Sequence, residues 1–351
     1  MNEHQDRRQF LKNSSAIAGL GLFTGKVIAP KSGEIILGHN NYKYKVIPNW
    51  GLLDAGQNPV NDCHEMVEDA KGRLIMITNE TKNNVLIYDK SGKLLETWGH
   101  DYIGGHGLSI LNEGGEQFLL ICDPDRHQVI KTDLKGKEIF KIDYPKETGV
   151  YAHPAKFKPT ETCVNPANGD IYVADGYGSN YIIQYNAKGQ YIRHFGGVGD
   201  AQGQFNCCHG IVVDTRSKQN PTLLITSRAS QMLKRFTLDG QYLATIPVPG
   251  SFICRPVIRG ENIYAACYKS TAMDYPNSGY VTILDKNDRV ISTPGGSSPI
   301  YTNGILEEQR KQDPNKVFMH PHDVYVDADE NIYVPQWNSK KTYPVKLERI
   351  G

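Results

Sequence analysis

The sequence predicts an all-β fold, a six-bladed β-propeller whose ring is closed by an N-terminal strand that pairs with the last blade. The chain has 351 residues with 34 Gly and 20 Tyr, which favours short strands joined by many turns over a helical bundle. One pattern of strands and turns recurs along the chain, and its last copy ends after about three strands. Residues 42–51 resemble the strand that this copy lacks.

The repeated segments predict the blades in order. The clear copies read as a strand, a turn with Gly or Asn, a second strand, a polar turn, a third strand, and a fourth strand introduced by Lys-Gly or Ser-Gly; they begin at residues 64, 106, 160 and 209. A looser fifth copy begins near Arg255, and the sixth begins at His322. Four strands in about 40 residues are typical of a propeller blade.

The fourth strand of the last blade is expected from the other end of the chain. The segment from Tyr42 to Gly51 resembles the terminal strand of the first copy, which runs from Lys93 to Gly99 and also ends in Trp-Gly. Pairing of this segment with the last blade would close the ring and hide the sheet edges.

The N-terminus is predicted to be a separate element. Arg7 and Arg8 precede a weakly apolar stretch from Ala16 to Phe23, as in a twin-arginine export signal, although Asp6 stands where Ser or Thr is more usual. The alternative is a ragged cytosolic N-terminus. We therefore expect an export signal over 1–30, a single propeller domain over 31–351, and a periplasmic or secreted protein. The apolar run is too short for a transmembrane span in the mature protein.

Charge and cysteine content narrow the function classes. The formal net charge is +1 and no strong basic stripe occurs, which argues against a nucleic-acid partner. The seven cysteines form no CxxC pair, so a thiolate zinc cluster is not expected. We expect a monomer that acts on a small molecule or a peptide.

Histidines stand at the heads of alternate repeats. The first strand of each propeller blade lines the central channel, and His106, His209 and His322 head the second, fourth and sixth copies. Alternate blades of a six-fold ring stand about 120° apart, so three imidazoles can meet at one axial point. Three nitrogens with an open fourth position suit zinc, although nickel, copper or iron would also accept them. Hydrogen-bonded channel histidines without a metal are the alternative.

Two further residues expected at the axis, His64 and Asp323, could also bind a metal ion. His64 heads the first copy and could be a ligand, a proton shuttle or a wall residue. Asp323 and strand carbonyls such as that of Leu108 could hold a hard cation such as calcium and tie blades together. Alternatively, Asp323 caps a loop or orients a histidine.

The repeats resemble the NHL family of six-bladed propellers over roughly residues 34–351. The resemblance rests on Gly169–Tyr177, which reads GDIYVADGY, on IIQY at 182–185, and on the link from Phe195 to Phe205 that leads into His209. Many NHL propellers serve as binding modules, so a protein- or glycan-binding role is the alternative to a metal-dependent enzyme with lyase or hydrolase chemistry.

Several motifs together resemble the catalytic core of peptidylglycine amidating lyase. They are GHGLS at 105–109, DGY at 175–177, GQF at 203–205 with His209, Ser227-Arg228, and PHD at 321–323. That family splits a peptidyl-α-hydroxyglycine into a peptide amide and glyoxylate. The resemblance implies zinc on His106, His209 and His322, a catalytic Tyr177, a substrate-binding Arg228, and calcium at Asp323 and the Leu108 carbonyl.

One departure from that family affects the expected chemistry. Its other arginine belongs at the end of the second strand of the first blade, where this chain has Thr78-Asn79. A neutral amide cannot supply that charge, so the identity of the substrate and the lyase reaction depend on what replaces it. Arg255 at the axis is the candidate, with Arg228, for neutralising a substrate carboxylate. A calcium-dependent lactonase-like propeller is disfavoured because imidazoles dominate the axis.

Overall fold

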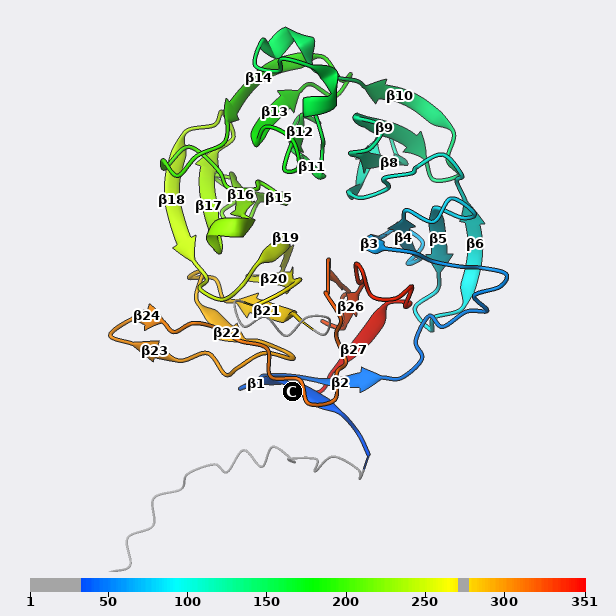
Figure 1. Cartoon of the computed structure of the whole chain (residues 1–351), viewed down its shortest axis with the longest axis vertical. Coiled ribbons are helices and arrows are strands. Elements are labelled where there is room, and N and C mark those ends of the chain that lie inside the picture. The colour runs from blue at the N-terminus through cyan, green and yellow to red at the C-terminus, as the bar shows by residue number, and fades with distance from the viewer. Residues whose placement is uncertain (1–32, 271–277) are drawn as a thin grey trace, which may run out of the picture. The chain divides into compact units, whose positions relative to one another are not determined.

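Six antiparallel sheets are arranged around a ring in the computed structural model (Figure 1), which describes residues 33–270 and 278–351. Residues 35–351 form one compact unit. The twin-arginine motif and the apolar stretch after it lie outside the described residues. Within the described ranges, no helix is long and apolar enough to cross a membrane.

The first five blades have four strands each, which run in sequence order. Blade 1 contains β3 (Cys63–Glu68), β4 (Leu74–Thr78), β5 (Val85–Tyr88) and β6 (Leu94–Trp98). Blade 2 contains β7 (Leu108–Glu113), β8 (Glu116–Asp123), β9 (Gln128–Asp133) and β10 (Glu138–Ile142). Blade 3 contains β11 (Glu161–Val164), β12 (Ile171–Ala174), β13 (Tyr181–Tyr185) and β14 (Tyr191–Gly196).

Blade 4 contains β15 (Ile211–Asp214), β16 (Thr222–Ser227), β17 (Met232–Thr237) and β18 (Tyr242–Pro247). Blade 5 contains β19 (Ile253–Arg259), β20 (Asn262–Cys267), β21 (Tyr280–Leu284) and β22 (Val290–Ser292). In Figure 1 the first strands lie nearest the axis and β6, β10, β14 and β18 lie at the rim. The short 3-10 helices η1 (Lys146–Thr148), η2 (Pro154–Lys156) and η3 (Arg228–Ser230) occur in connecting loops.

The sixth blade joins the two ends of the propeller and confirms the predicted closure. Its order is β25 (Tyr325–Val326), β26 (Ile332–Val334), β27 (Val345–Arg349), β2 (Tyr42–Ile47) and β1 (Ile36–His39). Tyr44 pairs with Arg349, and Ile47 with Lys346. The sequence did not predict β1, which adds a fifth strand, or the hairpin of β23 (Tyr301–Thr302) and β24 (Ile305–Leu306) before this blade.

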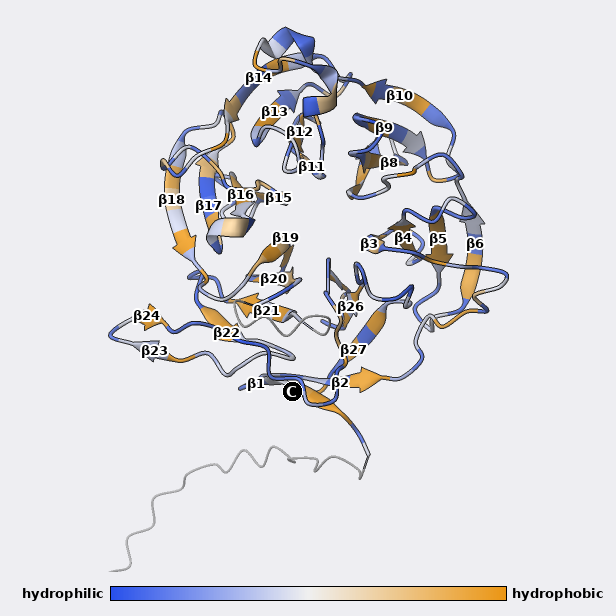
Figure 2. Ribbon diagram, viewed as in Figure 1, coloured by the Kyte–Doolittle hydropathy of each residue, from blue (hydrophilic) through white to orange (hydrophobic). Residues whose placement is uncertain are grey.

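Six apolar clusters fill the six interfaces between neighbouring blades. Strand β12 shows how one strand serves two of them: Ile171 and Val173 pack toward blade 2, whereas Tyr172 and Ala174 pack toward blade 4. Because successive side chains of a strand point to opposite faces, a blade buried on both faces needs a continuous apolar run. In Figure 2 the strands carry most of the hydrophobic colour.

Candidate metal centre

Three histidines from alternate blades lie together at the axis. His106, His209 and His322 each precede the first strand of a blade, namely β7, β15 and β25. Their ring centroids are 4.8 Å apart for His106 and His209, 4.8 Å for His106 and His322, and 4.9 Å for His209 and His322. Each side chain is at most 2% exposed. The structure therefore places the three predicted residues at the corners of a nearly equilateral triangle.

Each of these imidazoles is oriented by the neighbouring blade. Nδ1 donates a hydrogen bond to the backbone carbonyl at the head of the next blade: His106 to Thr160 at 2.8 Å, His209 to Cys254 at 3.1 Å, and His322 to His64 at 3.2 Å. A carbonyl only accepts, so Nδ1 carries the proton and Nε2 is left with a lone pair. Such outer hydrogen bonds fix the tautomer and the ring orientation of metal-binding histidines.

Glycines make this contact between blades possible. A Cβ on Gly107 would lie 2.6 Å from the Thr160 carbonyl oxygen, and one on Gly210 would lie 2.2 Å from that of Cys254. Each glycine follows a histidine of the triangle. Any larger residue would push the next blade away from the imidazole that it orients.

The hydroxyl of Tyr177 lies beside two of the histidines. It is 3.2 Å from Nε2 of His106 and 3.0 Å from Nε2 of His209. The single phenol proton of Tyr177 can be donated to only one of these two nitrogens, so the other is left without a donor. Nε2 of His322 is also buried, and it has no hydrogen-bond partner. Two buried acceptor nitrogens therefore lack a donor, and a metal ion is the species that would satisfy them together.

Burial also sets the protonation of these groups. It lowers the pKa of His106, His209 and His322 well below the usual range, so the imidazoles stay neutral at pH 7. Desolvation raises the pKa of Tyr177 to about 12, an effect that the nearby Arg228 partly offsets, although 41% of the residue's surface is exposed. Neutral imidazoles suit a metal, whereas a phenolate near pH 7 requires additional positive charge beside the hydroxyl.

His64 forms a fourth corner of the cluster. Its ring centroid is 4.4 Å from that of His106 and 4.7 Å from that of His322. The register of β3 shifts between Cys63 and Glu65, so His64 occupies a β-bulge, a feature that redirects side chains. Burial lowers the pKa of His64 to about 3, with a smaller contribution from the charge of Arg228. Nδ1 of His64 is buried without a hydrogen-bond partner. His64 is thus close enough to add a nitrogen to a metal held by its neighbours.

Arg228 lies beside Tyr177 at the start of η3. Its guanidinium carbon is 5.3 Å from the ring centroid of Tyr177 and 4.9 Å from that of Tyr268, and Nη1 is 3.8 Å from Sγ of Cys254. In the part of the chain that the structure describes, these aromatic and sulfur contacts take the place of a carboxylate partner. The guanidinium can therefore bind an anionic group from outside the chain.

A layer of charged residues lies next to the histidines along the axis. Arg255 forms two hydrogen bonds with the carboxylate of Asp323, at 2.9 and 2.7 Å, and its Nη1 lies 3.4 Å from the Leu108 carbonyl oxygen. Glu65 and Glu161 lie within 3.6 and 3.5 Å of the same guanidinium. Burial raises the pKa of Asp323 to about 7, although Arg255 opposes this.

This arrangement departs from two expectations. Calcium does not fit, because both oxygens of Asp323 and the carbonyl of Leu108, its expected ligands, face the Arg255 guanidinium instead. Arg255 also does not fit as the arginine that neutralises a substrate carboxylate, because Asp323 occupies its hydrogen-bonding fork. The sequence led us to expect both residues at the axis, but it did not reveal that they bind each other.

Asn79 lies in a loop network. Its side chain accepts from Nδ2 of Asn61 and from the backbone N–H of Asp62, both at 2.9 Å, and donates to the Asp62 carboxylate at 3.2 Å. These contacts use the amide for a connection between β4 and the loop before β3. The arginine of the amidating lyases therefore has no charged equivalent at this position.

Sequence reasoning missed Glu65, Glu161 and Cys254. The first two follow the head residues His64 and Thr160, just as Asp323 follows His322, so alignment of the repeats could have found them. Cys254 lies with His209 and His322 in a group whose candidate ligand atoms are all within 4.8 Å of one another. Its place at the axis depends on a register shift in β19, between Ile253 and Pro256, which gives no obvious sequence signal.

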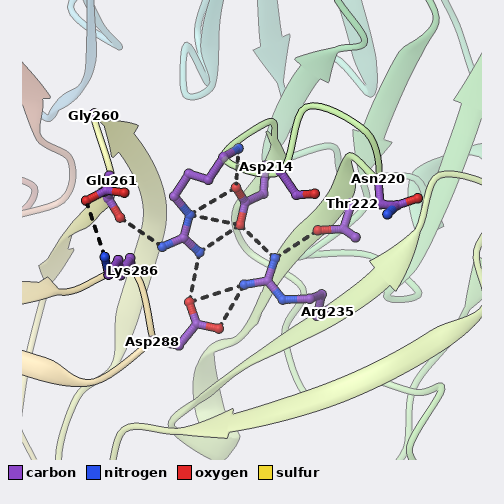
Figure 3. A pocket seen from close by; sticks show the side chains of 10 residues that line it. Asp214, Asn220, Thr222, Arg235, Gly260, Glu261, Lys286 and Asp288 are labelled. Carbon is purple, nitrogen blue, oxygen red and sulfur yellow. Dashed lines mark hydrogen bonds and ion pairs between the residues drawn. The ribbon is translucent and has the colours of Figure 1, made fainter.

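A second cluster of charges lies away from the histidines, between blades 4 and 5 (Figure 3). Arg216 and Arg235 each pair with both Asp214 and Asp288, at 2.6 to 2.9 Å, in a pocket of about 510 Å³. Two guanidinium groups and two carboxylates satisfy one another there. We interpret these four residues, called the interblade cluster below, as a connection between blades 4 and 5.

Known proteins were compared with the chain in sequence and in structure. No protein-family profile matches it. It is 27% identical over 263 residues to peptidylglycine alpha-amidating monooxygenase of Rattus norvegicus, which covers 72% of this chain and 24% of that protein. It is 28% identical over 276 residues to peptidyl-alpha-hydroxyglycine alpha-amidating lyase 1 of Drosophila melanogaster, a match that covers 72% of this chain and 46% of that protein. The chain thus spans about a quarter of the length of the rat protein and under half of that of the fly protein.

The structural comparison supports the fold alone. A streptogramin B lyase structure matches with a TM-score of 0.54 and 13% identity, covering 83% of this chain and 94% of that one. Together with the sequence matches and the ring of six blades, this shows an NHL-like propeller that resembles the amidating lyases.

Proposed function

We propose that the chain is a metal-dependent carbon–nitrogen lyase of the amidating-lyase type, acting on a small hydroxylated substrate such as a peptidyl-α-hydroxyglycine. The observation that carries this proposal is the triangle of neutral imidazoles beside the Tyr177 hydroxyl, with Arg228 next to the same ring. The similarity to animal enzymes named for amidation supports it.

His106, His209 and His322 would hold the metal, with His64 as a fourth nitrogen, a proton shuttle or part of the wall. Zinc is the ion that we propose, because three neutral imidazoles with one open position are its usual catalytic ligand set. When bound, the ion supplies positive charge that lowers the pKa of a hydroxyl group beside it.

The residues of the chain would then carry the proton and orient the substrate. Arg228 would bind the substrate carboxylate through a pair of hydrogen bonds. Tyr177, as phenolate, would take the proton of the substrate hydroxyl. The electron pair left on that oxygen forms the carbonyl of glyoxylate while the C–N bond breaks, and Tyr177 returns the proton to the departing amide nitrogen.

Glyoxylate release tests this reaction. Zinc-loaded protein incubated with an N-acyl-α-hydroxyglycine should release glyoxylate and the acyl amide in equal amounts, faster than the uncatalysed breakdown. The variant in which all three triangle histidines are replaced by alanine should show only the uncatalysed rate. Equal rates with wild-type and variant protein would contradict a lyase.

One observation favours a second candidate, a non-catalytic NHL propeller that binds a protein or glycan. Asn79 stands in place of the arginine of the amidating lyases, and its amide is used within a loop. A protein that binds no metal and instead retains a peptide or glycan ligand would fit this candidate.

We further propose that the mature protein is an exported monomer in the periplasm or outside the cell. Arg7 and Arg8 carry this proposal, because paired arginines before an apolar stretch direct export of folded proteins. Replacement of both by lysine should retain the protein in the cytosolic fraction, whereas unchanged export would contradict a twin-arginine signal.

A further inference from the structure

Arg255 is surrounded by carboxylates at the centre of the propeller. Its guanidinium lies 2.7 Å from Asp323, 3.5 Å from Glu161 and 3.6 Å from Glu65, measured between nitrogen and oxygen. The three carboxylate side chains are at most 1% exposed and that of Arg255 is 12% exposed. One positive side chain therefore faces three buried acids.

These contacts connect most of the ring. Arg255 belongs to blade 5, and its partners Glu65, Leu108, Glu161 and Asp323 belong to blades 1, 2, 3 and 6. The acids in turn hold neighbouring backbone: Glu65 accepts from the Leu108 N–H at 2.6 Å and Asp323 from the Met66 N–H at 3.1 Å. Residues in the first strands of four blades, with Asp323 just before the first strand of blade 6, thus meet in a single network.

We infer that Arg255 is a covalently attached cation that takes the place of a calcium ion at the propeller axis. Calcium requires six to eight oxygen ligands at about 2.3–2.6 Å, which a channel lined with carboxylates and carbonyls can provide. Here the carboxylate of Asp323 matches the planar fork of a guanidinium, and the Leu108 carbonyl faces the same group. The positive charge cannot dissociate, so the blades are held together without free calcium.

Removal of Arg255 should convert the layer into a cation site. Carboxylates from Asp323, Glu65 and Glu161 and the Leu108 carbonyl would remain around the vacated volume, and Oε2 of Glu161 accepts no hydrogen bond even now. A pocket of about 740 Å³, lined by residues further along the first strands and by Arg255 itself, offers an ion a route to it.

Melting temperatures of zinc-loaded protein with and without millimolar calcium test the inference. Wild-type protein should melt at the same temperature in both buffers. Arg255→Met should melt roughly 5–15 °C lower without calcium, because the buried acids lose the one cation that faces them, and should regain most of that loss with calcium. Arg228→Met, which removes a guanidinium that has no carboxylate partner, is the matched control and should not respond to calcium.

Arg255→Lys serves where the methionine variant fails to fold, since it keeps the charge and should remain insensitive to calcium. A wild-type protein stabilised by calcium, a calcium response in Arg255→Lys, or an Arg255→Met protein that melts like the wild type would each overturn the inference. An Arg255→Met protein that is destabilised but gains nothing from calcium would also contradict it. None of these readouts depends on the proposed lyase activity.

Discussion

Arginines meet carboxylates between blades both in the interblade cluster and at the axis, but the charge balance of the two regions differs. In the interblade cluster, Arg216 and Arg235 face Asp214 and Asp288, two charges of each sign. At the axis, Arg255 alone faces three acids. The interblade cluster is complete in itself, whereas the axis has more acceptors than donors.

Protonation reflects this difference. Although burial opposes it, hydrogen bonds from Arg216 and Arg235 lower the pKa of Asp214 in the interblade cluster to about 2. At the axis, burial outweighs the attraction of Arg255 and raises the pKa of Asp323 to about 7. The histidines beside it are likewise held neutral by burial. The same residue types are therefore ionised in one region, whereas burial favours the neutral form of Asp323 in the other.

The largest expected difference between the regions concerns catalysis at Tyr177. Tyr177→Phe should lower kcat for glyoxylate release by roughly 100- to 10,000-fold, because it removes the group that carries the proton. Asp288→Asn in the interblade cluster, measured beside it under the same conditions, should leave kcat unchanged. A phenylalanine variant that keeps wild-type kcat would remove Tyr177 from the reaction.

Arg228 should contribute less than Tyr177. Arg228→Lys keeps the charge but loses the planar fork, so kcat/KM should fall by about 10- to 100-fold. A substrate whose carboxylate is replaced by a neutral amide should show the same kcat/KM with both proteins. An equal loss on both substrates would mean that Arg228 supports the fold of the site rather than substrate binding.

Acid should destabilise the axis through its histidines. Burial lowers the pKa of His322 in the folded protein, whereas an unfolded histidine titrates near pH 6.5. As the pH falls, the unfolded state therefore takes up the proton first. The free energy of unfolding then falls as the pH drops below about 6.5. Urea unfolding of the metal-free proteins measures this between pH 6 and 5. Over that range the free energy of unfolding of the wild type should fall by about 1.4 kcal/mol more per pH unit than that of His322→Asn. Parallel curves would show that His322 is not held neutral.

The interblade cluster should give the smallest effect. Asp288→Asn leaves Asp214 paired with both arginines and removes one partly exposed carboxylate, so the free energy of unfolding should fall by about 1 kcal/mol. Urea denaturation at pH 7 measures this. A loss of several kcal/mol would show that the interblade cluster is as tightly coupled as the axis.

Repetition explains how much of this structure the sequence predicts. The six blades, the closure by Tyr42–Ile47 and the meeting of His106, His209 and His322 all follow from positions that recur in every repeat. Alignment of the repeats could also have marked Glu65, Glu161 and Asp323, which follow head residues. It does not show that they pair with Arg255, because a register shift in β19 decides where that side chain lies. Local irregularities and long-range charge pairing lie outside what a repeat pattern encodes.

Metal content tests the central claim most directly. Wild-type protein, purified from zinc-replete cells without chelators and measured by elemental analysis, should carry about one zinc per chain. The variant with alanine in place of His106, His209 and His322 should carry none, whereas Asp288→Asn should carry as much as the wild type. Metal-free wild-type protein, or equal zinc in the triple variant, would contradict a metal centre at the axis.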